Sequence, residues 1–411
     1  MTMTIEREWA RPSVEKRYEH PLVTNMDILR TLAGIIDDEE YMFFALVSTG
    51  WRNAWAADRP RVTRAVSAHC TVSQLEYSFA CGLRRSVGVC TAVARLGKMK
   101  SEAPSAEIKI KLLHCARSHG CGWGRETMAV AAESGSLDVL QHAHALGCAW
   151  DTSTCSGAAR EGHLGILQWA RATGCPWDER TCSEAAQRGH LGVLRWARDN
   201  GCPWNENVCR SAACGGHLEV LQYVRDNGCP WAKDTCSGAA RNGRLDILRW
   251  CRENGCPWDE NTCIGAATRG HLEVLQWARA NGCPWDAHVC SGAARQGHLG
   301  VLQWARENGC PWDARTTIEA AWGGNLGVLR WARANGCTWN EDTCRWAAWG
   351  GHLEILQWAK ANGCPWHHET CFAAAQNGHL DVLEWSRDNG CPGDDEVSQC
   401  SVHPTDEDDD L

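Results

Sequence analysis

Cysteine and histidine recur together along most of the chain, and both side chains can bind metals. Cys175, Cys182 and His190 follow one another in one stretch, and the same spacing returns every 27 residues. Structural zinc sites usually contain two cysteines only about two to four residues apart, which this spacing does not offer. The pattern also breaks, because Thr317 replaces a cysteine and Asn325 replaces a histidine. We therefore expect small buried thiols, with no metal ion and no cofactor.

The histidines could also act as general bases. They hold one position in successive segments, at His163, His190, His217, His271, His298, His352 and His379. A base that recurs without a paired nucleophile is unlike an active site, which gathers different groups in one place. The chain also has no Gly-rich phosphate loop, no His-Glu-x-x-His motif and no Gly-x-Ser-x-Gly motif. We predict that the protein is not an enzyme.

A basic ladder is the third feature with a chemical use. It consists of Arg171, Arg198, Arg225, Arg252, Arg279, Arg306, Arg333, Lys360 and Arg387. Such a ladder could follow a phosphate backbone. Acids come directly after several of these bases, as at Asp226 and Glu253, and the helix dipole alone favours a base near a helix C-terminus. Nucleic-acid binding through the ladder is therefore the alternative function and not the leading one.

All of these residues belong to one sequence repeat. The tetrapeptide Gly-Cys-Pro-Trp and its variants return every 27 residues, and ten full units cover residues 121–390. In a representative unit, Asp259 is a good N-cap and Gly270 ends a first helix. A second helix ends at Gly282, and Pro284 prevents it from continuing. Each unit is therefore predicted to form a pair of short helices.

The apolar patterns of the two helices differ. The first helix has a narrow stripe of small residues at Cys263, Ala266 and Ala267, which suits close helix contact. The second helix has a wider apolar surface, made of Leu272, Val274, Leu275, Trp277 and Ala278. This surface covers roughly 220° at 100° per residue, too wide for one neighbour. We expect neighbouring units to cover it on both sides, which makes the array a solenoid.

Two columns of tryptophan follow the same period. One runs from Trp123 to Trp366 and comes after the proline position, and the other runs from Trp169 to Trp385 along the second helices. Each ring can bury about 150–250 Å². Because both columns keep the apolar phase, we predict that they lie in the core between repeats.

Composition and charge exclude several classes. Eight acids lie in the last eighteen residues, and the rest of the chain has 42 acids against 41 bases. A near-neutral body favours neither nucleic acid nor a membrane surface as a partner. No apolar run approaches the roughly 18 residues of a spanning helix, and the sequence has no Asn-x-Ser/Thr site. We expect a soluble, monomeric protein of the cytoplasm or nucleus, with its 26 cysteines as thiols.

The segment TCIGAATRGHLEVLQWARANG resembles the ankyrin repeat, whose pattern contains Ala-Ala-x-x-Gly-His-Leu. The resemblance implies an all-α, ankyrin-like helical-hairpin solenoid of about ten 27-residue repeats with a helical N-terminal cap. Ankyrin repeats usually have about 33 residues, and the shortening falls in the β-hairpin loop, which puts that projecting finger in doubt. The family also implies a non-catalytic scaffold for protein–protein interaction.

The positions that vary between repeats are the candidate binding residues. In ankyrin arrays the region after the Ala-Ala pair lines the concave binding face. Here that region and the positions just before the pair contribute Arg160, Gln187, Arg241, Thr268, Arg295, Trp322, Trp346, Trp349, Phe372 and Gln376. Tryptophan outside the core phase is typical of interface anchors. Local packing of these aromatic rings against one another is the alternative interpretation.

Residues 21–60 include MDILRTLAGIIDDEEYMFFALVSTGWRNAW, which resembles an F-box. The resemblance implies docking onto the adaptor subunit of a cullin–RING ubiquitin ligase. The apolar residues that would make this contact are Ile28, Leu32, Ile36, Leu46 and Trp51. The alternative is a helical cap that covers the exposed end of the solenoid.

The predicted domain organisation follows from these segments. Residues 1–20 are expected to be disordered, and residues 21–60 form the F-box-like segment. Degenerate or capping repeats occupy residues 61–120, and the ankyrin-like repeats occupy residues 121–393. Residues 394–411 are expected to form a disordered acidic tail.

Overall fold

A computed structural model describes residues 72–80, 87–96 and 105–392. Within these ranges every regular element is an α-helix, which confirms the predicted all-α class. The predicted F-box-like residues Ile28, Leu32, Ile36, Leu46 and Trp51 lie outside the described ranges, as do the segments 1–20 and 394–411.

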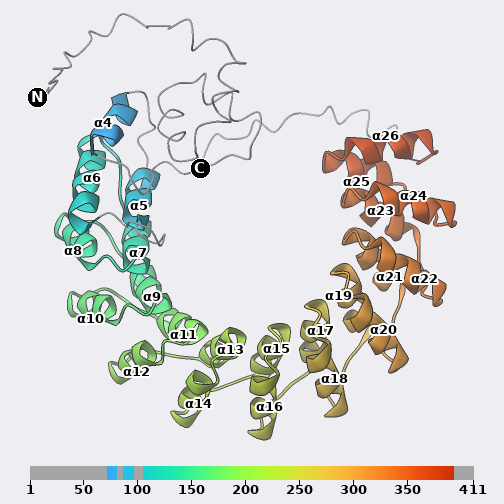
Figure 1. Cartoon of the computed structure of the whole chain (residues 1–411), viewed down its shortest axis with the longest axis horizontal. Coiled ribbons are helices and arrows are strands. Elements are labelled where there is room, and N and C mark those ends of the chain that lie inside the picture. The colour runs from blue at the N-terminus through green and yellow to red at the C-terminus, as the bar shows by residue number, and fades with distance from the viewer. Residues whose placement is uncertain (1–71, 81–86, 97–104, 393–411) are drawn as a thin grey trace, which may run out of the picture. The chain divides into compact units, whose positions relative to one another are not determined.

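The helices come in pairs along the chain (Figure 1). Three helices come before the ten repeats: α4 (Val72–Ala80), α5 (Val87–Arg95) and α6 (Ala106–Ser118). The first helices of the ten repeats that follow are α7 (Arg125–Glu133), α9 (Thr152–Arg160), α11 (Glu179–Arg188), α13 (Glu206–Gly215), α15 (Lys233–Arg241), α17 (Glu260–Thr268), α19 (Ala287–Arg295), α21 (Ala314–Trp322), α23 (Glu341–Trp349) and α25 (Thr370–Gln376). Their second helices are α8 (Leu137–Ala145), α10 (Leu164–Ala172), α12 (Leu191–Asp199), α14 (Leu218–Asp226), α16 (Leu245–Glu253), α18 (Leu272–Ala280), α20 (Leu299–Glu307), α22 (Leu326–Ala334), α24 (Leu353–Ala361) and α26 (Leu380–Asp388).

The chain divides into two compact units. Helices α4–α8 belong to the first unit and α11–α26 to the second, while α9 and α10 are divided between them. In the first unit α5 packs on α7, and α6 packs on both α4 and α8. Leu112, Leu113 and Ala116 of α6 are fully buried in these contacts. The helices α5 and α6 therefore pack on α7 and α8, the two helices of the first repeat.

Local sequence signals determine where each helix begins and ends. The side chain of Asp259 accepts a hydrogen bond from the Asn261 backbone N–H at 3.1 Å, and α17 begins at the next residue, Glu260. The helix α18 ends at Ala280, and Gly282 follows with a φ of +82°, in the left-handed region that favours glycine. The predicted helical hairpin is therefore confirmed. Only six residues separate α16 from α17, and no strand occurs in the described ranges, so these repeats carry no β-hairpin finger.

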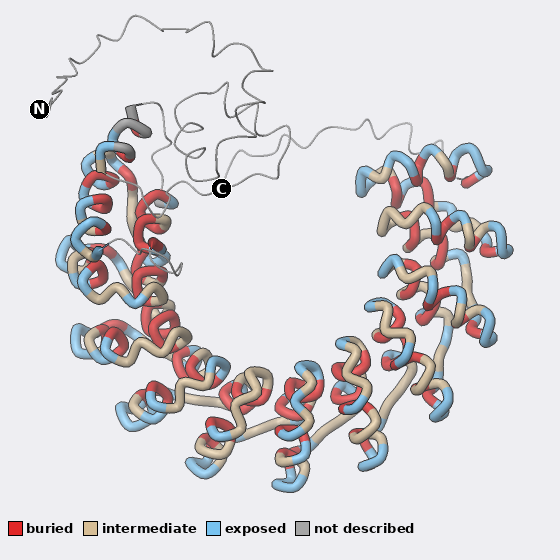
Figure 2. The backbone as a smooth tube through the Cα atoms, in the orientation of Figure 1, coloured by how far each residue is buried: buried red, intermediate tan, exposed pale blue. Residues whose placement is uncertain are grey.

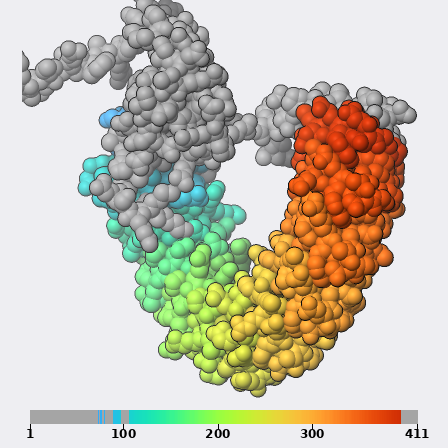
Figure 3. Space-filling view, turned by 45° about the vertical axis from the view of Figure 1, so that its right-hand side comes forward, coloured from blue at the N-terminus to red at the C-terminus, as the bar shows by residue number. Residues whose placement is uncertain are grey.

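The second unit has two layers, and its first helices form the tighter one. Consecutive first helices contact one another from α11 to α25, whereas most consecutive second helices make few contacts. Cys263, Ala266 and Ala267 are fully buried, because their small side chains let neighbouring first helices approach closely. Figure 2 shows exposed positions gathered at the ends of the second helices, and Figure 3 shows the repeats from α15 to α26 packed into one continuous surface.

The second helices are covered less completely than their apolar width predicted. Val274, Leu275 and Ala278 of α18 are buried, but Leu272 and Trp277 are only half-buried. Consecutive second helices make few contacts with one another, so the neighbouring units cover this surface only in part. The predicted cover on both sides is therefore incomplete at Leu272 and Trp277.

The two tryptophan columns pair with each other inside most repeats. The rings of Trp258 and Trp277 meet edge to face, with 6.0 Å between their centroids, and both are half-buried. The same T-shaped pairing recurs in other repeats, as in Trp285–Trp304 and Trp339–Trp358. The prediction that both columns lie in the core between repeats is thus wrong, because these rings are only half-buried.

A recurrent threonine at the start of the first helix offers a stability test. Thr343 is fully buried, and its hydroxyl has no hydrogen-bond partner. Valine stands at the equivalent position in two other repeats, at Val208 and Val289. We expect Thr343→Val to raise the free energy of unfolding by about 1 kcal/mol, because it removes an unsatisfied buried hydroxyl. Urea unfolding of both proteins measures this change, and a lower midpoint for Thr343→Val would contradict it.

Candidate binding face on the first helices

The predicted binding residues lie on the solvent side of the first helices. The position after the buried Ala-Ala pair is exposed at Gln187, Arg241, Arg295 and Gln376. It is half-buried at Arg160, Thr268, Trp322 and Trp349. Trp346 is half-buried and Phe372 is 39% exposed. None of the ten residues lies in the core, and we call the surface that they form in the second unit the first-helix face.

Three tryptophans of this face form one cluster. The rings of Trp322 on α21 and Trp346 on α23 lie 4.8 Å apart, tilted by 43°. The ring of Trp349 lies 5.9 Å from that of Trp346, tilted by 54°. We call Trp322, Trp346 and Trp349 the tryptophan cluster. The cluster joins two neighbouring repeats, because the ring of Trp346 contacts Trp349 on the same helix, α23, and Trp322 on the preceding first helix, α21.

Arginine side chains lie against the faces of these rings. The guanidinium carbon of Arg295 is 3.6 Å from the centroid of Trp322, and that of Arg345 is 5.5 Å from the centroid of Trp346. Such cation–π contacts attract the guanidinium to the ring and hold both side chains in place. The cluster therefore presents apolar rings and positive charge side by side.

Each of these arginines also faces an acid of the following repeat: Glu319 lies on α21, and Glu369 is the N-cap residue of α25. Arg295 Nε lies 3.7 Å from Glu319 Oε2, and Arg345 Nε lies 3.1 Å from Glu369 Oε2. Burial raises the pKa of Glu319, and the charges of Arg295 and His288 oppose this shift. The face is thus a mosaic of both charges around the rings.

A third ion pair at the other end of the second unit has the same spacing. Arg160 binds Glu184 in a bidentate manner, with Nε to Oε2 at 2.9 Å and Nη2 to Oε1 at 2.8 Å. The hydrogen bond from Arg160 lowers the pKa of Glu184, while burial opposes it. In all three pairs the acid comes 24 residues after the arginine. Glu184, Glu319, Arg345 and Glu369 were not among the predicted site residues, because the 27-residue period of the sequence does not indicate a 24-residue spacing between partners.

The recurrent histidines hold the backbone under the face. His352 Nε2 donates to the carbonyl oxygen of Trp322 at 3.0 Å, and His379 Nε2 donates to that of Trp349 at 3.1 Å. These two histidines therefore act as hydrogen-bond donors at the inter-helix turn. Asn325 takes the place of the histidine in its repeat and makes an equivalent hydrogen bond, from its Nδ2 to the Arg295 carbonyl oxygen at 2.8 Å. Each bond fixes the carbonyl of a binding-face residue in the repeat before.

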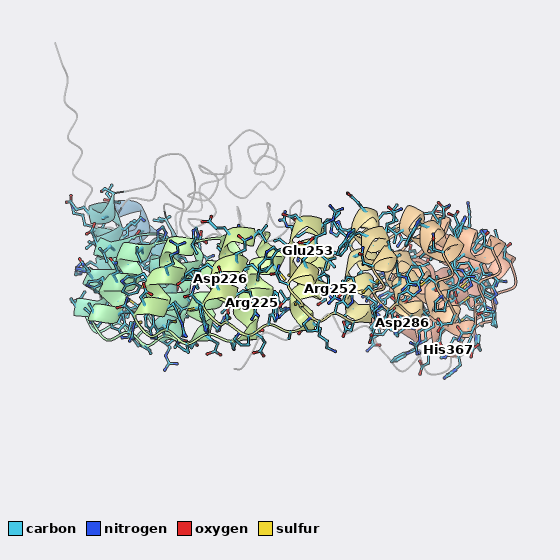
Figure 4. All side chains as sticks on the ribbon, turned by 90° about the horizontal axis from the view of Figure 1, so that it is seen from below. Arg225, Asp226, Arg252, Glu253, Asp286 and His367 are labelled. Carbon is cyan, nitrogen blue, oxygen red and sulfur yellow. The ribbon has the colours of Figure 1, made fainter. Side chains whose placement is uncertain are left out.

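The basic ladder is engaged in closing the turns between repeats. Arg252 donates from Nη1 to the carbonyl of Cys256, and its guanidinium carbon lies 4.1 Å above the centroid of Trp258. Arg225 makes the same hydrogen bond to Cys229 and lies 4.0 Å above Trp231. Figure 4 shows Arg225 beside Asp226 and Arg252 beside Glu253, on the second helices. The bases thus have structural partners, and exposed acids accompany them.

The spacing Cys175, Cys182, His190 does not produce a metal site in the structure. The Cys182 thiol instead forms a hydrogen bond with the thiol of Cys202, the first cysteine of the next repeat. This bond, together with burial, raises the pKa of the Cys202 thiol. The imidazole of His190 is bonded through Nε2 to the Arg160 carbonyl at 3.0 Å. Over the residues that the structure describes, the cysteines are free thiols, and all but Cys214 are buried.

Comparisons with known proteins give a distant structural likeness. No family model matches the chain, and no curated protein matches it. Among solved structures, the chain is similar to the crystal structure of the human ASB11 ankyrin repeat domain. The two share 18% identity with a TM-score of 0.32, over 38% of this chain and 84% of that one. The fold assignment therefore rests on the helical-hairpin repeats themselves. None of the helices described is long and apolar enough to cross a membrane.

Proposed function

We propose that the chain is a protein-binding scaffold that holds partner proteins on the first-helix face. The observation that carries this proposal is the tryptophan cluster. Trp322, Trp346 and Trp349 are large rings, half-buried outside the core, on a backbone that histidine hydrogen bonds hold in place. Rings fixed in this way lose little conformational entropy on binding and can bury a large area, as interface anchors do.

The charges around the cluster favour protein over nucleic acid as the partner. Glu319 and Glu369 accompany Arg295 and Arg345, so that the rim carries both signs. A phosphate backbone would be repelled by those acids, whereas a protein surface can match both charges. The first-helix face thus has an aromatic centre and a polar rim, the arrangement found in protein interfaces.

We further propose that residues 21–60 act as an F-box, which would make the chain a substrate receptor of a cullin–RING ubiquitin ligase. This extension rests on the resemblance of that segment alone, and on Ile28, Leu32, Ile36, Leu46 and Trp51 as the adaptor contacts. Replacing Leu32 and Trp51 with alanine is expected to remove adaptor and cullin from the proteins that co-purify with the chain, while partners of the repeats remain. If no adaptor or cullin subunit co-purifies with the wild-type chain, the extension is wrong.

A photo-crosslinking experiment tests the face itself. A photoreactive amino acid replaces Gln376, which is exposed at the end of α25, and in a second variant it replaces Glu307, which is exposed on α20. Both variants are irradiated in cells of the source organism, and the crosslinked proteins are identified by mass spectrometry. We expect specific adducts from position 376 and none of those from position 307. Equal adducts at the two positions, or crosslinks to nucleic acid at 376, would contradict the proposal.

A further inference from the structure

Three buried cysteines meet in one repeat of the second unit. Cys236 comes from α15, Cys251 from α16, and Cys256 from the turn after α16. Their sulfur atoms all lie within 4.8 Å of one another, and all three residues are fully buried. Across the described ranges, no other group of three or more histidine, cysteine, aspartate or glutamate side chains has its ligand atoms this close together.

The third thiol distinguishes this repeat from the others. A hydrogen-bonded pair of thiols at the positions of Cys236 and Cys256 is part of the repeat, and recurs as Cys209–Cys229, Cys263–Cys283, Cys290–Cys310 and Cys344–Cys364. The position of Cys251 holds a residue without a thiol in these other repeats: Val224, Ala278, Ala305 and Ala359. Cys251 therefore adds a third sulfur where packing requires none.

Two positively charged side chains act on the three sulfurs. The charges of Arg225 and Arg252 both favour a negative charge at Cys256. Arg252 is held near by its hydrogen bond to the Cys256 carbonyl. The three sulfurs thus have two cations near them.

We propose that Cys236, Cys251 and Cys256 bind one Cu(I) ion. Soft thiolate ligands favour Cu(I) and Zn²⁺ over harder metal ions. Structural Zn²⁺ sites have four ligands, and in the described part of the chain no fourth histidine, cysteine, aspartate or glutamate has its ligand atom within 4.8 Å of all three sulfurs. On binding, each thiol gives its proton to solvent as its sulfur–copper bond forms. The two guanidinium groups then offset the net negative charge of the copper and its three thiolates.

Competition for Cu(I) tests the site. The full-length protein and Cys251→Ala are reduced, kept free of oxygen, and titrated with Cu(I) against increasing bicinchoninate, a chelator that reports the copper it holds by its colour. Alanine is the residue that other repeats have at this position, so that Cys251→Ala keeps a native core, which circular dichroism checks. The thiol pairs are common to both proteins. We expect the wild type to retain one equivalent of Cu(I) at a chelator concentration where Cys251→Ala retains at least tenfold less.

A gain of copper binding provides the matched test. Ala278 on α18 has the same relation to Cys263 and Cys283 as Cys251 has to Cys236 and Cys256. We expect Ala278→Cys to retain a second equivalent of Cu(I) under the same competition. Equal retention by wild type and Cys251→Ala would overturn the proposal. So would preferential retention of Zn²⁺ by the wild type when the two ions compete.

Discussion

Replacement of Trp346 with alanine is expected to weaken the binding of a partner by about 30- to 100-fold, the size of effect found at interface anchors. Trp346 is the central ring of the tryptophan cluster, because it contacts both Trp322 and Trp349. Its loss removes a large apolar contact and also releases the two rings that it orients. Isothermal titration of a partner identified by crosslinking at Gln376 measures the dissociation constant of each variant.

A tryptophan of similar burial on the other layer provides the control for this prediction. Trp304 on α20 is half-buried and pairs edge to face with Trp285 at 5.9 Å. Trp304→Ala removes an equal aromatic side chain and is expected to lower stability while leaving partner affinity within about twofold, because it lies outside the first-helix face. If Trp346→Ala is folded and binds as tightly as the wild type, the cluster is packing and not an anchor.

The solvent side of the first helices could be predicted from the sequence, but the contacts made there could not. The residue after Ala266-Ala267 falls outside the buried stripe because the helical period is 3.6 residues, so the placement of Thr268 and Trp322 follows. The acid that each arginine contacts could not be predicted in this way. Arg295 meets Glu319, 24 residues on and not 27, because neighbouring first helices contact with an offset of about one turn. That offset is a property of repeat packing, which periodicity alone does not contain.

The helix boundaries were predictable because their signals are local. Asp259 and Gly282 act within a few residues of themselves, and the helices begin and end beside them. The predicted burial of the tryptophan columns was wrong for the opposite reason. The phase of Trp277 indicates which side of α18 it occupies. How far the ring is buried depends on the contacts between consecutive second helices, which are few. Burial of a wide aromatic surface therefore depends on the geometry of the whole array.

Replacement of Gly324 with alanine is expected to destabilise the second unit by about 2–4 kcal/mol. Gly324 has a φ of +76°, and a Cβ added there would lie 2.8 Å from the imidazole Cε1 of His352. The left-handed backbone costs an alanine about 1 kcal/mol, and the overlap with the ring adds about 1–3 kcal/mol. A displaced imidazole would also lose its hydrogen bond to the Trp322 carbonyl. Partner affinity should therefore fall together with the free energy of unfolding measured in urea.

Gly300→Ala is the matched control, because it adds the same methyl group where nothing opposes it. Gly300 lies in α20, outside the left-handed region of φ, and a Cβ there would meet no atom within 4 Å. Alanine in a helix is favoured over glycine, so that this variant should be more stable than the wild type by about 0.5–1 kcal/mol. Opposite signs for the two substitutions would show that the constraint is local to Gly324, where the left-handed backbone and the contact with His352 act together. A neutral Gly324→Ala would mean that the imidazole moves aside freely, and that the histidine bonds do not hold the tryptophan cluster in place.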